Sequence, residues 1–267
     1  MLQEGKTFSG IAFEKGFYGE NVFNETLKAG GGLRKFYSTL DSYFMRTLSY
    51  TTFRISGFLY FYDWINPDSR REARQDFYVM AAYAGGMAGG ILSNPCELVF
   101  SRMQVDEMYP EQSRRNYKNF ADGFLKAAEE GALFRGAVAN GLKFGGLTAC
   151  ATGLYDWFKE NFFYFFGPYA INRYIGTAIG CFAATMLSYP FDTIKTRLHT
   201  MRPLPNGVYP YSGSIDALYK IIRFEGNQNK LSNPGALYSG GLTYFGRLYG
   251  IAIMTQYMLD WYYAANL

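Results

Sequence analysis

The chain has 267 residues, of which 49% are hydrophobic, 19% aromatic and 18% charged. A disordered chain is excluded, because this much apolar surface offsets the entropy lost on ordering. Cys96, Cys150 and Cys181 are far apart and odd in number, and His199 is the single histidine, so we expect no disulfide framework, metal site, cofactor or histidine catalysis. The net charge of +4 is small and spread along the chain, which argues against nucleic acid as a partner.

Five apolar stretches approach the length of about 20 residues that a bilayer crossing requires. They lie near residues 40–63, 77–99, 138–158, 169–190 and 236–260. Small residues recur at a four-residue spacing in the second and fourth stretches, and this spacing lets helix backbones approach closely in lipid. The pairs are Gly85/Gly89, Gly86/Gly90 and Gly176/Gly180. A buried, glycine-rich helix of a soluble protein is the alternative interpretation.

Most of the 26 Lys and Arg residues lie in three segments, at 6–35, 102–135 and 195–230. One membrane crossing for each apolar stretch places all three segments on the same side. The positive-inside rule produces this asymmetry, so the charge distribution supports the five crossings jointly.

A short motif occurs twice, with a period of about 100 residues, and repeats at a fixed period indicate a repetitive fold. Each copy ends an apolar stretch with a proline, followed by an acid two residues later and an arginine seven residues after the proline. The residues are Pro95, Glu97 and Arg102 in one copy and Pro190, Asp192 and Arg197 in the other. The first third of the chain fits the same plan from its middle onward.

These motifs resemble those of the mitochondrial carriers, whose signature is Pro-x-[Asp/Glu]-x-x-[Lys/Arg]-x-[Lys/Arg] in each of three repeats. Pro190, Asp192, Lys195 and Arg197 match the signature fully, whereas Phe100 replaces the first base in the other copy. The resemblance implies an all-α membrane protein with the mitochondrial carrier fold, built from pseudo-repeats at 1–66, 67–166 and 167–267.

The repeat spacing places the first helix of the first repeat upstream of Met1. Charged residues interrupt every apolar run within 1–38, so we do not expect this segment to span a membrane. We therefore expect an incomplete carrier fold of five transmembrane helices plus short matrix helices.

In the family, prolines kink the odd-numbered helices, and their acids pair with bases on neighbouring helices to form a gate on the matrix side. By resemblance the kinks fall at Pro95 and Pro190, and the matrix gate network is Glu97, Asp192 and Lys195. We expect Glu97 to pair with Lys195, and Asp192 to have a polar partner outside the odd-helix ring. Solvated charges at a membrane interface are the alternative. The expected intermembrane-side gate network is Asp63, Asp156, Lys159 and Asp260.

Basic residues inside apolar stretches are costly and mark a pathway or a pairing site. The run Arg46-x-x-x-Tyr-Thr-Thr-x-Arg54 is similar to the second helix of the 2-oxoglutarate/malate carriers. Arginine binds carboxylates through paired hydrogen bonds, which suits such substrates. Bases that snorkel, or that pair with acids of the chain, are the alternative. By resemblance the substrate-contact equivalents are Arg46, Tyr50, Arg54, Lys143 and Arg247.

Two functions remain open at this point. The first is a transport-inactive, multi-pass protein of the mitochondrial inner membrane that serves as a structural subunit of a larger complex, for example one of the respiratory chain. An open seam at the first helix would expose a cationic lining to lipid, which favours a partner there. We expect the bilayer, with cardiolipin among its lipids, and other inner-membrane subunits as partners, and no enzymatic activity. The alternative is an antiporter of 2-oxoglutarate/malate-type dicarboxylates.

Overall fold

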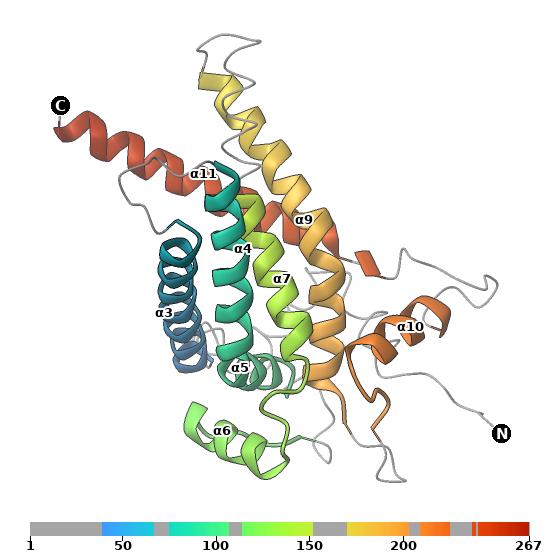
Figure 1. Cartoon of the computed structure of the whole chain (residues 1–267). Coiled ribbons are helices and arrows are strands. Elements are labelled where there is room, and N and C mark those ends of the chain that lie inside the picture. Colours follow the sequence, from blue (N-terminus) through green and yellow to red (C-terminus); the bar gives the residue numbers. More distant parts are fainter. Residues whose placement is uncertain are drawn as a thin grey trace, which may run out of the picture.

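The computed structural model describes residues 39–66, 75–106, 114–151, 170–202, 209–224, 237–238 and 240–266. Within these ranges the long regular elements are eight α-helices, which confirms the expected all-α class (Figure 1). Their bounds are Leu40–Ile65 for α3, Gln75–Leu92 for α4, Asn94–Asp106 for α5, Phe120–Glu129 for α6, Ala137–Ala149 for α7, Ala170–Thr200 for α9, Ser214–Phe224 for α10 and Gly241–Asn266 for α11.

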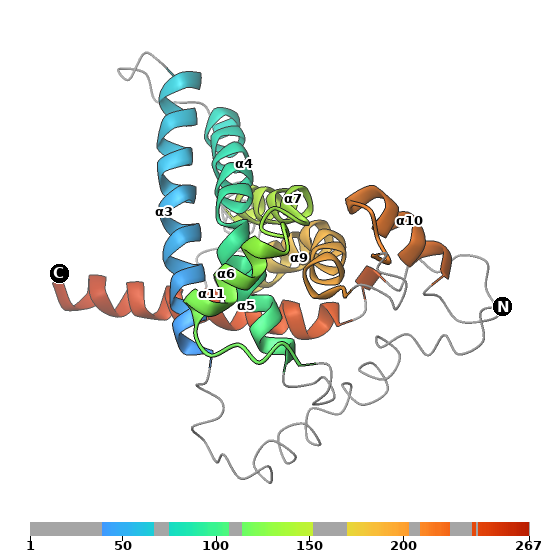
Figure 2. The same cartoon turned by 90° about the horizontal axis from the view of Figure 1, so that it is seen from below.

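The longer helices pack in chain order, α3 against α4, α4 against α7, α7 against α9 and α9 against α11. Four of them, α3, α4, α7 and α9, stand side by side in both views, whereas α11 runs across them (Figures 1 and 2). Bases and acids that are far apart in the sequence therefore meet between neighbouring helices.

Glycines of α4 allow the closest of these helix contacts. A Cβ atom at Gly85 would lie 2.5 Å from Phe58 N of α3, and one at Gly89 would lie 2.9 Å from the backbone of Arg54. On the opposite side, a Cβ atom at Gly90 would lie 2.8 Å from Asn140 O of α7. Larger residues would push the backbones apart, so the close approach predicted from the four-residue spacing is present.

The shorter helices α5, α6 and α10 gather at one end of the long helices (Figure 1). α6 packs on α5 through a core that includes Leu98, Val99 and Ala127, and α10 packs on α9 through a core that includes Ile194 and Ile221. These two cores hold the ends of α5 and α9 in place, where the Pro-x-acid motifs lie.

Each predicted apolar stretch contains a helix, but the bounds differ. The stretch at 138–158 matches α7 as far as Ala149, and its part from residue 152 lies outside the described residues, while α9 extends beyond 190 to Thr200. The stretch at 77–99 is divided, because α4 ends at Leu92 and α5 begins at Asn94. Taken by length and hydropathy, none of the helices among the described residues qualifies as a membrane-crossing segment. The number of five transmembrane helices stays a prediction, and residues 1–38 lie outside the described part of the chain.

Candidate functional site

The carboxylate of Glu97 is the centre of a buried ion network that joins three helices. It accepts hydrogen bonds from Arg46 Nε of α3 and from Lys195 Nζ of α9. The side chains are 3% exposed for Glu97, 2% for Lys195 and 18% for Arg46. A carboxylate this far from water is stable only beside such partners. The ion pair expected between Glu97 and Lys195 is therefore present, and Arg46 is a further partner.

Asp192 pairs with a base of α7. Lys143 Nζ lies 2.7 Å from Asp192 Oδ1, and the two side chains are 5% and 17% exposed. This partner is on α7 and therefore outside the helices that carry the Pro-x-acid motifs, α5 and α9, as expected. The sequence, however, assigned Lys143 to substrate contact. Like Arg46, Lys143 is thus paired with an acid of the chain itself, which was the alternative interpretation of these bases.

The other predicted substrate-contact residues lie against aromatic rings. Tyr50 stacks on Phe144 with ring centroids 4.0 Å apart, and Arg54 Cζ lies 5.9 Å from the Tyr50 centroid. Arg247 Cζ lies 4.9 Å from the centroid of Tyr244. Within the described part of the chain, no carboxylate lies at ion-pair distance from Arg54 or Arg247. The role of these residues in substrate contact stays a prediction.

Phe100 replaces the base of the Pro95 motif and contacts Arg46 instead. The guanidinium carbon of Arg46 lies 4.8 Å from the ring centroid of Phe100, which is 8% exposed. A partly desolvated guanidinium over a ring gains up to about 2 kcal/mol. The ring therefore helps to hold Arg46 beside Glu97. In the sequence, Phe100 is notable only because it replaces a base of the motif. The contact could have been suspected from Arg46 in a neighbouring apolar stretch, because arginine packs over aromatic rings.

The two motif prolines have different positions in their helices. Pro190 lies inside α9, which continues to Thr200. Pro95 lies in the first turn of α5, after the break at Ser93, where a proline removes no intrahelical hydrogen bond. Only Ser93 separates the two helices, and the hydrogen bonds from Ser93 N–H to Gly89 O and from Glu97 N–H to Ser93 O keep the helical pattern on both sides of it. The interruption expected near Pro95 is therefore present, and a kink at Pro190 stays a prediction.

A second buried polar group joins the ends of α5 and α9. His199 Nε2 lies 3.2 Å from Asn94 Oδ1, and Arg102 Nε donates to the His199 carbonyl oxygen at 3.1 Å. Asn94 Nδ2 donates to Leu133 O at 2.8 Å, which attaches the loop before α7. The sequence did not single out these side chains as a group, because nothing in their spacing indicates that they meet.

The predicted intermembrane-side gate network lies largely outside the described residues. Asp63 is exposed in α3. Asp156 and Lys159 lie outside the described residues, and Asp260 belongs to α11 but its side chain is outside the description. The role of these four residues stays a prediction.

The helices α6 and α10 carry the same local arrangement of an acid and a lysine four residues later. Lys126 Nζ lies 2.9 Å from Asp122 Oδ2, and Lys220 Nζ lies 2.8 Å from Asp216 Oδ2. Each carboxylate also accepts a hydrogen bond from a backbone N–H just before its helix. The lysine hydrogen bond, followed by the backbone one, lowers the pKa of both carboxyl groups.

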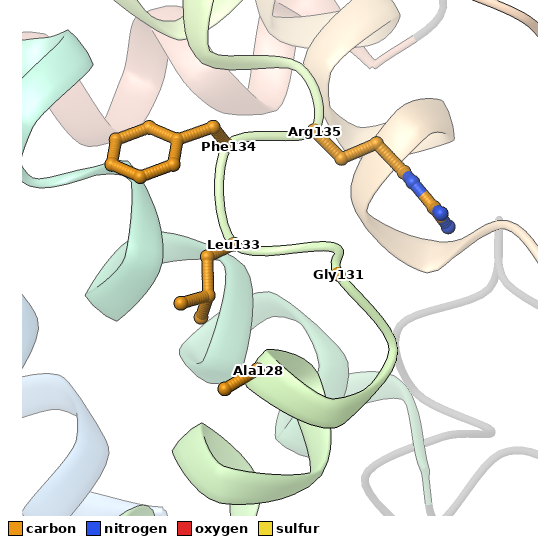
Figure 3. A pocket seen from close by; sticks show the side chains of 5 residues that line it. All are labelled: Ala128, Gly131, Leu133, Phe134 and Arg135. Atoms are coloured by element: carbon orange, nitrogen blue, oxygen red, sulfur yellow. The ribbon is translucent and has the colours of Figure 1, made fainter.

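A hollow of about 370 Å³ lies apart from the ion network, at the turn between α6 and α7. It is lined by Ala128, Gly131, Leu133, Phe134 and Arg135. In Figure 3, Leu133 and Ala128 lie close together while Phe134 and Arg135 point to opposite sides. None of the predicted site residues lines this hollow, so the candidate site is the group of paired charges between the helices.

Comparison with known proteins assigns this architecture to a family. The sequence model described as "Mitochondrial carrier protein" matches residues 77–165 and 168–259. The chain belongs to the mitochondrial carrier family, as the Pro-x-acid motifs predicted.

Several relatives cover most of the chain. It is 54% identical over 262 residues to the "Macronuclear solute carrier homolog CR-MSC" of Oxytricha fallax, spanning 98% of this chain and 71% of that protein. It is 30% identical to the "Probable mitochondrial 2-oxoglutarate/malate carrier protein" of Dictyostelium discoideum, over 84% of this chain and 70% of that protein. It is 25% identical to the "Mitochondrial 2-oxoglutarate/malate carrier protein" of Homo sapiens, over 90% of this chain and 75% of that protein.

Proposed function

We propose that this protein resides in the mitochondrial inner membrane as a carrier-fold subunit of a larger assembly and does not transport substrate by itself. Its mitochondrial relatives support the location. A respiratory-chain complex is the first assembly to test. The bilayer, with its cardiolipin, and neighbouring protein subunits are the proposed partners.

The observation that carries the proposal is the internal pairing of the bases that a carrier of this type would offer to an anion. Arg46 is bound to Glu97, and Lys143 is bound to Asp192. Glu97 and Lys143 are almost fully buried, so each pair excludes water and strengthens the attraction between its charges. A substrate carboxylate would have to displace a carboxylate of the chain, which lowers its affinity by the free energy of that internal pair.

The outer surfaces of α3 and α11 support a role in contact with lipid and protein. Leu40, Phe44 and Leu48 on α3, and Met254 and Met258 on α11, are each more than half exposed. Exposed apolar patches of this kind mark membrane or protein contacts.

Isolation of the native assembly tests the proposal. The tagged chain, expressed from its own locus, is extracted in mild detergent and analysed by native electrophoresis and quantitative mass spectrometry. We expect most of the chain to migrate with one assembly, at a fixed ratio to its other subunits. A chain that migrates as a monomer under these conditions contradicts the proposal.

A second candidate function is exchange of dicarboxylates of the 2-oxoglutarate/malate type. It is favoured by Arg54 and Arg247, which lie without a carboxylate partner among the described residues, and by the names of several relatives. Liposomes that contain only this chain discriminate the two functions. Saturable malate/2-oxoglutarate exchange that is lost in Arg54→Ala and Arg247→Ala would establish transport. We expect no exchange above that of liposomes without protein.

A further inference from the structure

The helix α11 has one long side that no described helix covers. Its main packing partner is α9, and it runs across the other long helices (Figures 1 and 2). A Cβ atom at Gly246 or at Gly250 would have no neighbour within 4 Å, while Met254 is 65% exposed and Trp261 is 66% exposed. At about 100° per residue these four residues lie on one side of the helix, which we name the open face of α11.

Arg247 lies beside the open face and is itself exposed. Its guanidinium carbon lies 4.9 Å from the ring centroid of Tyr244, and no carboxylate of the described ranges lies at ion-pair distance from it. Arg46 and Lys143 differ, because acids of the chain itself neutralise them. An arginine on an apolar surface is costly in lipid unless it is paired, so Arg247 calls for an acid from outside these ranges.

We propose that the open face of α11 binds an apolar helix of another subunit, and that a carboxylate on that helix pairs with Arg247. This rests on the proposed function and names the kind of partner it requires. Gly246 and Gly250 are four residues apart, and small residues at this spacing let a second backbone approach closely. The exposed side chains of Met254 and Trp261 supply apolar surface for the same contact.

The charge of Arg247 decides which occupant fits. In a symmetric dimer the same patch of both copies meets, which would place Arg247 of one copy close to Arg247 of the other, and like charges repel. A lipid tail offers no anion to the guanidinium group. A partner helix that carries an acid among apolar residues fills the open face and neutralises the charge, since charges within a membrane pair with one another.

Incorporation of variants into the native assembly tests the contact. The full chain is extracted in mild detergent, and the fraction of each variant in the assembly is measured by mass spectrometry. We expect Gly250→Leu and Arg247→Glu to be at least about fivefold depleted from it, as for the loss of a close helix contact. Thr255→Leu, an exposed position on the other side of α11, is the matched control and should assemble like the wild type.

Stability of the isolated chain separates loss of assembly from loss of folding. Gly250→Leu should be at least as stable in detergent as the wild type, because a Cβ atom there meets nothing within 4 Å. If Arg247→Glu does not fold, Gly250→Leu alone decides. Assembly of both variants at the wild-type level would overturn the inference and leave the proposed function intact, whereas a wild-type chain found outside any assembly would contradict both.

A photoreactive amino acid in place of Met254 identifies the occupant. We expect it to label one segment of another subunit, apolar and containing an acid. Replacement of that acid by arginine should restore assembly of Arg247→Glu. Labelling of a second copy of this chain, or of lipid alone, would overturn the inference.

Discussion

Around Pro95 the chain leaves one helix and enters another, whereas around Pro190 a single helix continues for another ten residues to Thr200. The acid that follows each proline nevertheless reaches a base on a neighbouring helix. Glu97 reaches two bases and is almost fully buried, while Asp192 reaches one and is partly exposed. The same motif therefore fixes where the acid lies, and the packing around it sets the number and depth of its partners.

This difference separates two roles for similar residues. Removal of one member of a deeply buried ion network leaves the others as unpaired charges, which is strongly destabilising. A pair with a route to water can open and close at lower cost. We therefore expect the loss of Glu97 to destabilise the fold more than the loss of Asp192.

The largest expected effect is that of Glu97→Gln. The substitution leaves Arg46 and Lys195 without their carboxylate, and we expect the free energy of unfolding to fall by about 3–5 kcal/mol. Asp192→Asn is expected to cost clearly less, because Lys143 loses a partner that is nearer to water. Reversible unfolding in mixed micelles measures both. An Asp192→Asn loss equal to or larger than that of Glu97→Gln would break the comparison.

Helix packing provides the next effect. Gly85→Ala places a methyl group 2.5 Å from the backbone of α3, and we expect a loss of about 1–3 kcal/mol from overpacking. Gly246→Ala on α11 is the matched control, since a Cβ atom there has no neighbour within 4 Å. It should cause no loss of stability and can add up to about 1 kcal/mol, because alanine favours a helix over glycine. Equal losses at both positions would contradict the proposed role of glycine between α3 and α4.

Removal of the ring beside Arg46 is expected to have a smaller effect. Phe100→Leu should cost about 1 kcal/mol more in the wild type than in an Arg46→Met background, because only the wild type has a cation over the ring. Thermal unfolding of the four proteins checks this. The same cost in both backgrounds would mean that Phe100 contributes packing alone.

The smallest effect concerns the ion pairs of α6 and α10. Hydrogen bonds from Lys126 and Lys220 lower the pKa of Asp122 and Asp216 in the folded chain, so the pairs contribute stability above the ordinary carboxyl pKa of about 4. This contribution is lost as the pH falls through the lowered pKa. Asp122→Asn and Asp216→Asn should each be slightly less stable than the wild type at neutral pH and should converge with it in acid. Differences that do not depend on pH would contradict this account.

Much of the fold follows from the sequence, because apolar stretches and motif spacing are local properties. The stretch at 40–63 predicts α3 closely, whereas the stretch at 236–260 predicts α11 with an offset of five residues at its start and six at its end. The pairing of Glu97 with Lys195 was predicted from the resemblance to the family. The break at Ser93 agrees with the nearby Pro95, which has no N–H to continue the helix. The hydrogen bonds from the Asn94 side chain to the carbonyl groups of Leu133 and Arg135 were not predictable, because that loop is distant in the sequence.

The partners of the bases were harder to predict for the same reason. Arg46 and Lys143 are expected to contact substrate by resemblance, yet each is bound to an acid brought near by helix packing. No spacing rule states which of several acids lies at the right depth beside a given base. The contact between His199 and Asn94 could likewise not be predicted from the sequence, because the two residues are on different helices.

The central claim, that internal acids hold the bases of the site, is tested most directly by a double-mutant cycle on Lys143 and Asp192. The free energy of unfolding is measured for the wild type, Lys143→Gln, Asp192→Asn and the double variant under one set of conditions. We predict a coupling energy of about 1–3 kcal/mol, as found for residues in direct contact. Losses that add to within about 0.3 kcal/mol would show that the two side chains do not interact, and would contradict the account.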